Sequence, residues 1–79
     1  MPKTFINTVQ KQAIDFRRLI RETRKEKKIT QETLAKAIGV SRVTYTEREN
    51  DIRKMRLEEF LITLDELGIG INLYERGNQ

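Results

Sequence analysis

The sequence contains no cysteine and no histidine. These two absences exclude disulfides, thiolate chemistry and the usual ligands of zinc, so we expect no structural metal and no cofactor. No apolar run approaches the ~18 to 20 residues of a membrane-spanning helix, and the N-terminus lacks the apolar segment of a signal peptide. We therefore expect a cytoplasmic protein without a membrane partner.

The 79 residues are enough for one domain with one core, and a hydrophobic content of 37% can supply a modest core of helices. Domains of this size have marginal stability when they stand alone, and many of them gain stability from dimerisation. The composition therefore already favours an oligomer.

Charge is distributed unevenly along the chain, although the net charge is only +4. Residues 1–28 carry nine Lys or Arg and three Asp or Glu, whereas residues 57–79 carry one and five. A basic end is the electrostatic footprint of a phosphate-binding surface. The basic cluster Arg17–Lys28 has two interpretations, a contact with DNA or merely the solvated face of a long helix. The acidic end should face away from DNA.

The segment 30–38 has the pattern of a short capped helix. Leu34, Ala35 and Ile38 recur at a spacing that places them on one helical face, and Thr30 supplies a hydroxyl suited to an N-cap. This pattern predicts a helix over residues 31–38.

A tight turn and a second helix are predicted to follow. Gly39 can adopt the left-handed conformation that ends a helix, and Ser41 is a second suitable N-cap. Tyr45 can face the first helix from a second one over residues 42–49. The outer face of this second helix is then formed by Arg42, Val43, Thr44, Thr46 and Glu47.

The window Thr30–Asn50, which reads TQETLAKAIGVSRVTYTEREN, resembles the helix-turn-helix of the phage-repressor and Cro-like (Xre) family. The resemblance extends over residues 16–68. Within that family, residues 57–75 are most similar in spacing to small antitoxin regulators of the HipB type. The resemblance implies a mainly α fold, a compact repressor-like domain of four to five helices, here followed by a short C-terminal β-strand.

The chain departs from the family pattern at four positions, which are Thr23, Lys28, Arg48 and Asp51. The family usually has an apolar residue at the first and third of these positions and a glycine at the other two. These departures affect how helices one and three end. At Arg48 we expect the aliphatic stem to cover the core while the guanidinium reaches water.

The remaining segments complete a three-part organisation. We expect an N-terminal arm at 1–7, a helix-turn-helix DNA-binding domain at 8–68, and a C-terminal strand and tail at 69–79 for dimerisation. The domain should contain a first helix from Asn7 or Thr8 to about Lys27, a loop at 50–56 with room for a helical turn, and a last helix at 57–67.

Residues 69–74 alternate between apolar and other side chains with the period of a β-strand. An isolated strand leaves its backbone groups unsatisfied, and Lys3–Ile6 is only a faint candidate for a partner. We therefore expect Ile69, Ile71 and Leu73 to pair with the same strand of a second copy in a homodimer. The alternative is an extended tail packed against its own helices.

The resemblance also implies roles at the DNA. Ser41, Arg42, Val43 and Thr44 match the positions from which the family reads base edges, whereas Thr30, Gln31 and Thr46 match positions that hold phosphates. Arg42 is suited to guanine, although it equally suits a phosphate. For Glu47, an ion pair is favoured over a contact with cytosine.

Three function classes follow from these observations. The first is a transcriptional regulator, a dimeric repressor that binds a palindromic operator in double-stranded DNA. The second is an antitoxin that also neutralises a partner toxin protein, and the third is a helical protein-interaction module without DNA binding. We expect no catalytic residues, because no nucleophile or histidine accompanies the carboxylates of the predicted helices.

Overall fold

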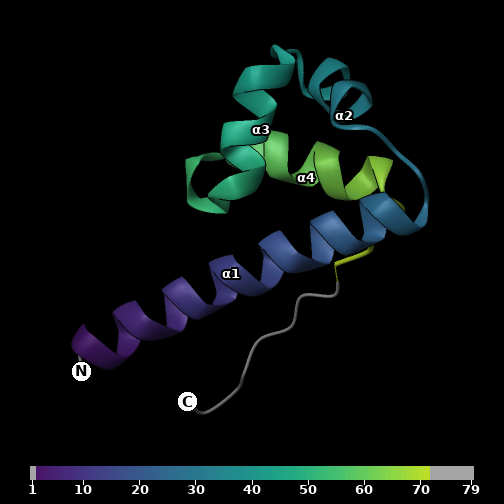
Figure 1. Cartoon of the computed structure of the whole chain (residues 1–79). Helices are drawn as coiled ribbons and strands as arrows, with labels where there is room; N and C mark the ends of the chain where they lie inside the picture. Colours follow the sequence, from purple (N-terminus) through teal and green to yellow (C-terminus); the bar gives the residue numbers. More distant parts are fainter. Residues whose placement is uncertain (1, 72–79) are drawn as a thin grey trace.

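The computed structural model describes the backbone of residues 2–71 and the side chains of residue 13 and residues 15–71. The elements in chain order are α1 (Pro2–Glu26), α2 (Gln31–Ile38), α3 (Arg42–Asn50), the short 3-10 helix η1 (Ile52–Lys54) and α4 (Leu57–Glu66) (Figure 1). The predicted mainly α class is therefore confirmed for the described residues, and η1 is the helical turn expected inside the loop.

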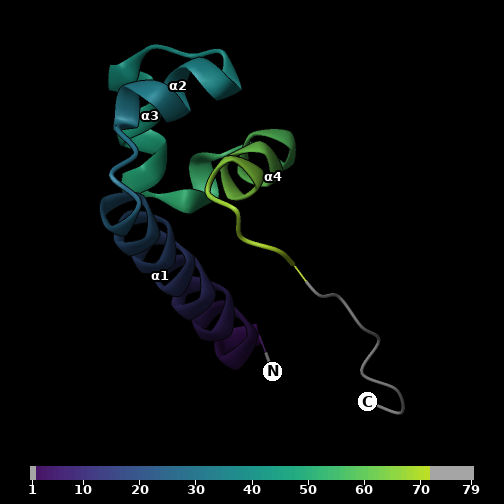
Figure 2. The same ribbon diagram turned by 90° about the vertical axis from the view of Figure 1, so that its right-hand side faces the viewer.

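Helix α1 is longer than the sequence predicted, because it begins at Pro2 and not at Asn7 or Thr8. The prediction of an arm at 1–7, and of a possible strand at Lys3–Ile6, is wrong from Pro2 onward. Proline suits the first turn of a helix, where its missing N–H needs no partner, and no glycine or proline follows before the helix ends. Figures 1 and 2 show the N-terminal half of α1 projecting beyond the other helices.

The end of α1 is formed by a left-handed turn at Lys28, whose φ is 58°. The N–H of Ile29 donates to the carbonyl of Arg24 at 2.9 Å, and that of Lys28 donates to the carbonyl of Lys25 at 3.1 Å, the pattern of a Schellman motif. Lys28 stands where the Xre pattern usually has glycine. The left-handed turn therefore forms although its central residue is a lysine, and the positive φ strains the backbone there.

The turn between α2 and α3 has the chemistry that the sequence predicted. Thr30 Oγ1 accepts from the N–H of Thr33 at 3.1 Å, and Ser41 Oγ accepts from the N–H of Thr44 at 3.1 Å. Gly39 is left-handed, with a φ of 77°. The bounds of α2 agree with the prediction, and α3 extends one residue further than predicted, to Asn50.

The core lies where the helices meet. Its buried apolar residues are Ile20, Leu34, Ala35, Tyr45, Leu64 and Leu67. Helix α2 packs on α3 and α4, and α1 packs on α3 and η1. The rings of Phe16 in α1 and Phe60 in α4 meet edge to face, with centroids 5.0 Å apart. Leu61 of α4 lies outside this core and is 47% exposed.

A hydrogen bond joins the end of α4 to the residues that follow α1. Gly68 is left-handed, with a φ of 71°, and Lys27 Nζ donates to the carbonyl of Leu67 at 2.6 Å. Residues 69–71 belong to no helix or strand, and the rest of the predicted strand, 72–74, lies outside the described residues. Ile69 packs partly against the core.

Candidate nucleic-acid interface

Helix α3 has an inner and an outer face with different residues. Tyr45 and Glu49, four residues apart, are 0% and 1% exposed on the inner face. Arg42 and Val43 are exposed on the outer face, and the Val43 side chain is 71% exposed. A single exposed apolar residue is common on protein surfaces, so Val43 gains its meaning from its place at the start of α3 beside Arg42.

Two hydroxyl residues at the start of α3 bond to each other. Ser41 Oγ donates to Thr44 Oγ1 at 2.9 Å, while it also accepts the N-cap bond. Ser41 is exposed and Thr44 is half-buried. The structure therefore brings Ser41, Arg42, Val43 and Thr44, the four predicted base-reading residues, together at one end of α3.

Two of the three residues predicted to hold phosphates are bonded to each other across the motif. Thr46 Oγ1 lies 3.0 Å from Gln31 Oε1 and 2.9 Å from the carbonyl of Arg42, so its one proton is shared between two acceptors. Gln31 Nε2 donates to Glu49 Oε1 at 3.3 Å. Gln31 thus joins the start of α2 to two successive turns of α3. Thr30, the third residue, is exposed at its cap.

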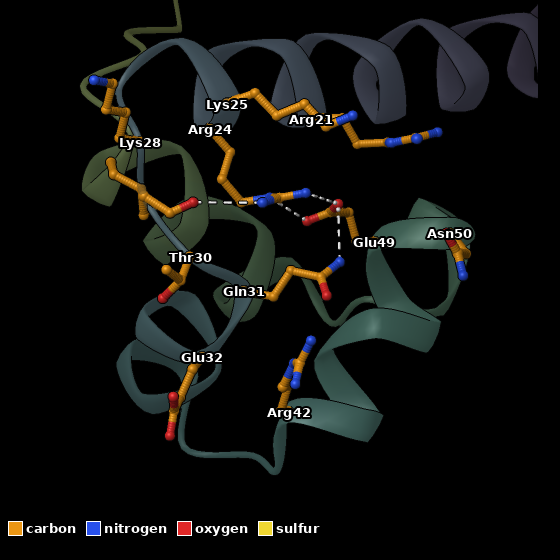
Figure 3. Close-up of a pocket in the computed structure, with 11 residues that line it drawn as sticks. Arg21, Arg24, Lys25, Lys28, Thr30, Gln31, Glu32, Arg42, Glu49 and Asn50 are labelled. Atoms are coloured by element: carbon orange, nitrogen blue, oxygen red, sulfur yellow. Dashed lines mark hydrogen bonds and ion pairs between the residues drawn. The ribbon is translucent and has the colours of Figure 1, made fainter.

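A bidentate ion pair joins α1 to α3. Arg24 Nε and Nη2 each lie 3.1 Å from a carboxylate oxygen of Glu49 (Figure 3). The side chains are 13% and 1% exposed, so this pair is largely removed from solvent. The fork geometry fixes the orientation of both groups, and the pair therefore sets the position of α3 relative to α1.

The Tyr45 hydroxyl lies beside this ion pair. It is buried and has no hydrogen-bond partner among the described residues. Burial first, and then the neighbouring Glu49 carboxylate, raise the pKa of Tyr45 far above its ordinary value. The phenol therefore stays neutral, and Tyr45 serves the core.

Sequence reasoning placed Arg24 only within the basic cluster and did not assign Glu49 a partner. One signal was available, because Glu49 follows Tyr45 by four residues and so lies on the same face of α3. A carboxylate on a face that turns inward needs a cation or several donors. The sequence did not reveal which of the many basic residues would supply them.

A groove of about 720 Å³ lies between α1 and the helix-turn-helix pair. Its walls include Arg21, Lys25 and Lys28 on the α1 side and Gln31 and Arg42 on the other (Figure 3). Both sides thus contribute cationic groups. The groove is also lined by the carboxylates of Glu32 and Glu49, but the cationic groups outnumber them, and an open groove with an excess of positive charge suits a chain of phosphates better than an apolar ligand.

The half-buried Arg48 side chain pairs with Glu59 and so links α3 to α4. The half-buried side chain agrees with a stem that covers the core, and the carboxylate partner is a contact that the sequence did not predict. Burial disfavours the charged form of Glu59, but bonds from the N–H of Arg56 and from Arg48 outweigh it, so the pKa of Glu59 lies below its ordinary value. Asp51, another of the departures, caps η1 by accepting from the N–H of Arg53 at 3.1 Å.

The predicted dimerisation residues do not share one environment. Ile69 packs partly against the core of its own chain, Ile71 is 43% exposed, and Leu73 lies outside the described residues.

Within residues 2–71, no group of three or more Asp or Glu could hold a metal ion. In the same part of the chain, no helix is long and apolar enough to cross a membrane.

The comparisons with known proteins agree with this geometry. A family model described as helix-turn-helix matches residues 20–74, which is more than half of the chain. The matched family is the broad Xre-like one, and the match does not distinguish the HipB-type subgroup. Comparison with curated proteins and with solved structures gave no match.

Proposed function

Since this chain belongs to the Xre-like helix-turn-helix family, we propose that it is a dimeric transcriptional repressor that binds a palindromic operator through α3. The observation that carries the proposal is the outer face of α3, where Val43 is 71% exposed beside the exposed Arg42. A recognition helix presents such residues to the major groove, where base edges offer both hydrogen-bonding atoms and thymine methyl groups.

Base reading is assigned to Ser41, Arg42, Val43 and Thr44. The guanidinium of Arg42 suits O6 and N7 of guanine, and the methyl groups of Val43 and Thr44 suit the methyl group of thymine. The exposure of Arg42 and Val43 and their place at the start of α3 support this assignment.

Phosphate binding is assigned to Thr30, Gln31 and Thr46, and Thr46 takes part by orienting the Gln31 amide, because its own proton is donated within the protein. Bonds to Thr46 and Glu49 fix the side-chain amide of Gln31 at the start of α2. The second hydrogen of this amide is then available to donate to a phosphate. The positive end of the α2 dipole favours an anion there. These contacts position the protein on the duplex without reading its sequence.

The DNA-binding domain is assigned to residues 8–68, and dimerisation to residues 69–79 through Ile69, Ile71 and Leu73. The exposure of Ile71, at 43%, supports an apolar contact with a second copy. Two copies related by a two-fold axis would place their α3 helices in half-sites about one helical turn apart, so the operator should be palindromic.

Selection from random duplexes, followed by a gel-shift titration at low salt, tests the proposal. We expect enrichment of a palindrome whose half-sites lie about 10 bp apart, and a shift that weakens as salt rises. If the protein shifts no duplex even at low salt, the DNA-binding proposal is wrong and the third class, a helical protein-interaction module, takes its place.

A second candidate function is that of an antitoxin that also binds a partner toxin. Leu57 and Leu61 are 73% and 47% exposed and lie one turn apart on α4, which favours a protein contact there. The test is co-purification with the product of a gene that neighbours this one, for example a HipA-like kinase. Leu57→Ser with Leu61→Ser should abolish that co-purification and leave DNA binding intact. Retained co-purification would contradict this use of α4.

A further inference from the structure

A stripe of basic residues runs along α1 and past its end. Arg18, Arg21, Lys25 and Lys28 follow one another at intervals of three, four and three residues. The first three lie on one face of the helix at this spacing. Together with Glu22 they line a hollow of about 240 Å³. The part of the stripe within α1 is called the α1 basic face here and comprises Arg18, Arg21 and Lys25.

The α1 basic face keeps a net positive charge, because its three cationic groups share their hollow with one carboxylate, that of Glu22. The ion pairs among the described residues belong to Arg24, Arg48 and Arg53, and none of them involves this face. Like charges three or four residues apart on a helix repel and destabilise it. Arg24 on the same helix has a carboxylate partner, but the α1 basic face has none among the described residues. An anion from outside the chain would relieve the repulsion among its cationic groups.

The α1 basic face is continuous with the groove at the proposed DNA interface. Arg21 and Lys25 line the 240 Å³ hollow and also border the 720 Å³ groove, on whose other side lies Arg42 of α3 (Figure 3). An anion that follows this surface from α3 therefore reaches α1 without a break. From Arg18 to Lys25 the helix rises by roughly 10 Å, enough to face successive phosphates of one strand.

We propose that the α1 basic face is a second phosphate-binding surface, which contacts the DNA backbone on the flank of the segment read by α3. The proposal rests on the proposed function, since it takes the ligand of α3 to be DNA. Arg18 precedes residue 20, where the family match begins, so part of this surface is additional to the matched domain. Its contacts are independent of sequence and lengthen the footprint on DNA.

The dependence of duplex affinity on salt tests the proposal, because each phosphate contact contributes about 0.9 to the slope of log K against log salt. The test protein is a double variant, called the α1 variant, that carries Arg18→Gln and Lys25→Gln. The control is a second double variant, which carries Lys36→Gln and Arg56→Gln. Each pair removes one exposed arginine and one exposed lysine, and the control pair borders neither hollow. Circular dichroism checks that both variants keep their helix content.

On a duplex of about three helical turns, the slope of the α1 variant should be shallower by about two for each bound chain, and so by about four for the proposed dimer, whereas the control should keep the slope of the parent chain. A parental slope in the α1 variant, or an equal loss in the control, would overturn the proposal. On a duplex just long enough for the two half-sites, the difference between the α1 variant and the parent chain should shrink, because the flank is missing. An undiminished difference on the short duplex would contradict a contact on the flank.

The two proposals fail in different ways. If the parent chain itself shows no salt-dependent affinity for the long duplex, the proposed function is wrong. If the parent chain binds and the α1 variant matches it in affinity and slope, only the second surface is wrong.

Discussion

At the scale of single residues, the side chains of α3 that build the core are separate from those proposed to read DNA. Tyr45 and Glu49 are buried, and Arg42 and Val43 are exposed. Substitutions on the outer face should therefore change binding with little effect on stability, and substitutions on the inner face should change stability first.

Arg42→Ala should cost about 1 to 3 kcal/mol of binding on the selected operator and relax the preference at one base pair. The measurement is a titration of the operator and of duplexes changed at single base pairs, and Lys36→Ala is the control. If Arg42→Ala weakens all sequences equally and lowers the salt slope by about one for each bound chain, Arg42 holds a phosphate and does not read a base.

Glu49→Gln should destabilise the fold by about 2 to 4 kcal/mol, because it leaves the Arg24 guanidinium largely buried without a counter-charge. Chemical denaturation measures the loss. Arg53→Gln is the control, since it removes an ion pair whose side chains are 56% and 32% exposed, and it should leave the stability nearly unchanged. If the two substitutions lowered the free energy of unfolding equally, burial of the ion pair would not be the cause of the loss of stability.

At the scale of elements, the sequence predicted what local chemistry decides. The caps Thr30 and Ser41 and the turn at Gly39 follow from residues within the same short segment, so α2 and α3 could be placed. The start of α1 was missed, because Asn7 and Thr8 suit a cap but do not force one. The ion pair of Arg24 was missed because its partner lies 25 residues further along the chain.

Gly39→Ala should cost about 1 kcal/mol, because the new Cβ has open space but the φ of 77° disfavours any side chain. Gly70→Ala provides the matched control, since its Cβ also meets no atom within 4 Å and its φ is not positive. Thermal unfolding of both variants measures the difference. A control as unstable as Gly39→Ala would rule out backbone conformation as the cause.

The link between α3 and α4 should depend on pH. Because the pKa of Glu59 is lower in the folded state than its ordinary 4.5, its stabilising effect is present above that value and is lost as the pH falls through the folded pKa. Glu59→Gln should therefore be less stable than the parent chain at neutral pH, and the difference should shrink in acid. Unfolding midpoints measured over a pH series check this. A difference that stays constant down to strongly acidic pH would contradict the role of the charge.

At the scale of the whole molecule, charge is separated along the chain. Residues 1–28 have a large basic excess, and α1 and the groove beside it carry much of it, whereas α4 begins an acidic end. In the proposed dimer the acidic ends meet or lie near the two-fold axis, and the basic surfaces stay free for DNA.

Light scattering after size-exclusion chromatography should give the mass of two chains at micromolar concentration. Ile71→Glu should give the mass of one chain, because a charge at this apolar, 43% exposed position opposes its burial between copies. Val43→Glu is the control, since it adds the same charge to the outer face of α3 and should leave the dimer intact. A monomeric parent chain would contradict the dimer.

The division of α3 into two faces also bears on how this protein can evolve. The buried side chains that hold the helix in place are not those proposed to face an operator, so mutations at Arg42 and Val43 meet few constraints from the core. Lineages can therefore drift to new operators through folded intermediates, without compensating changes elsewhere. Copies of such a gene within one genome would be able to diverge in the promoters they control while keeping the same scaffold.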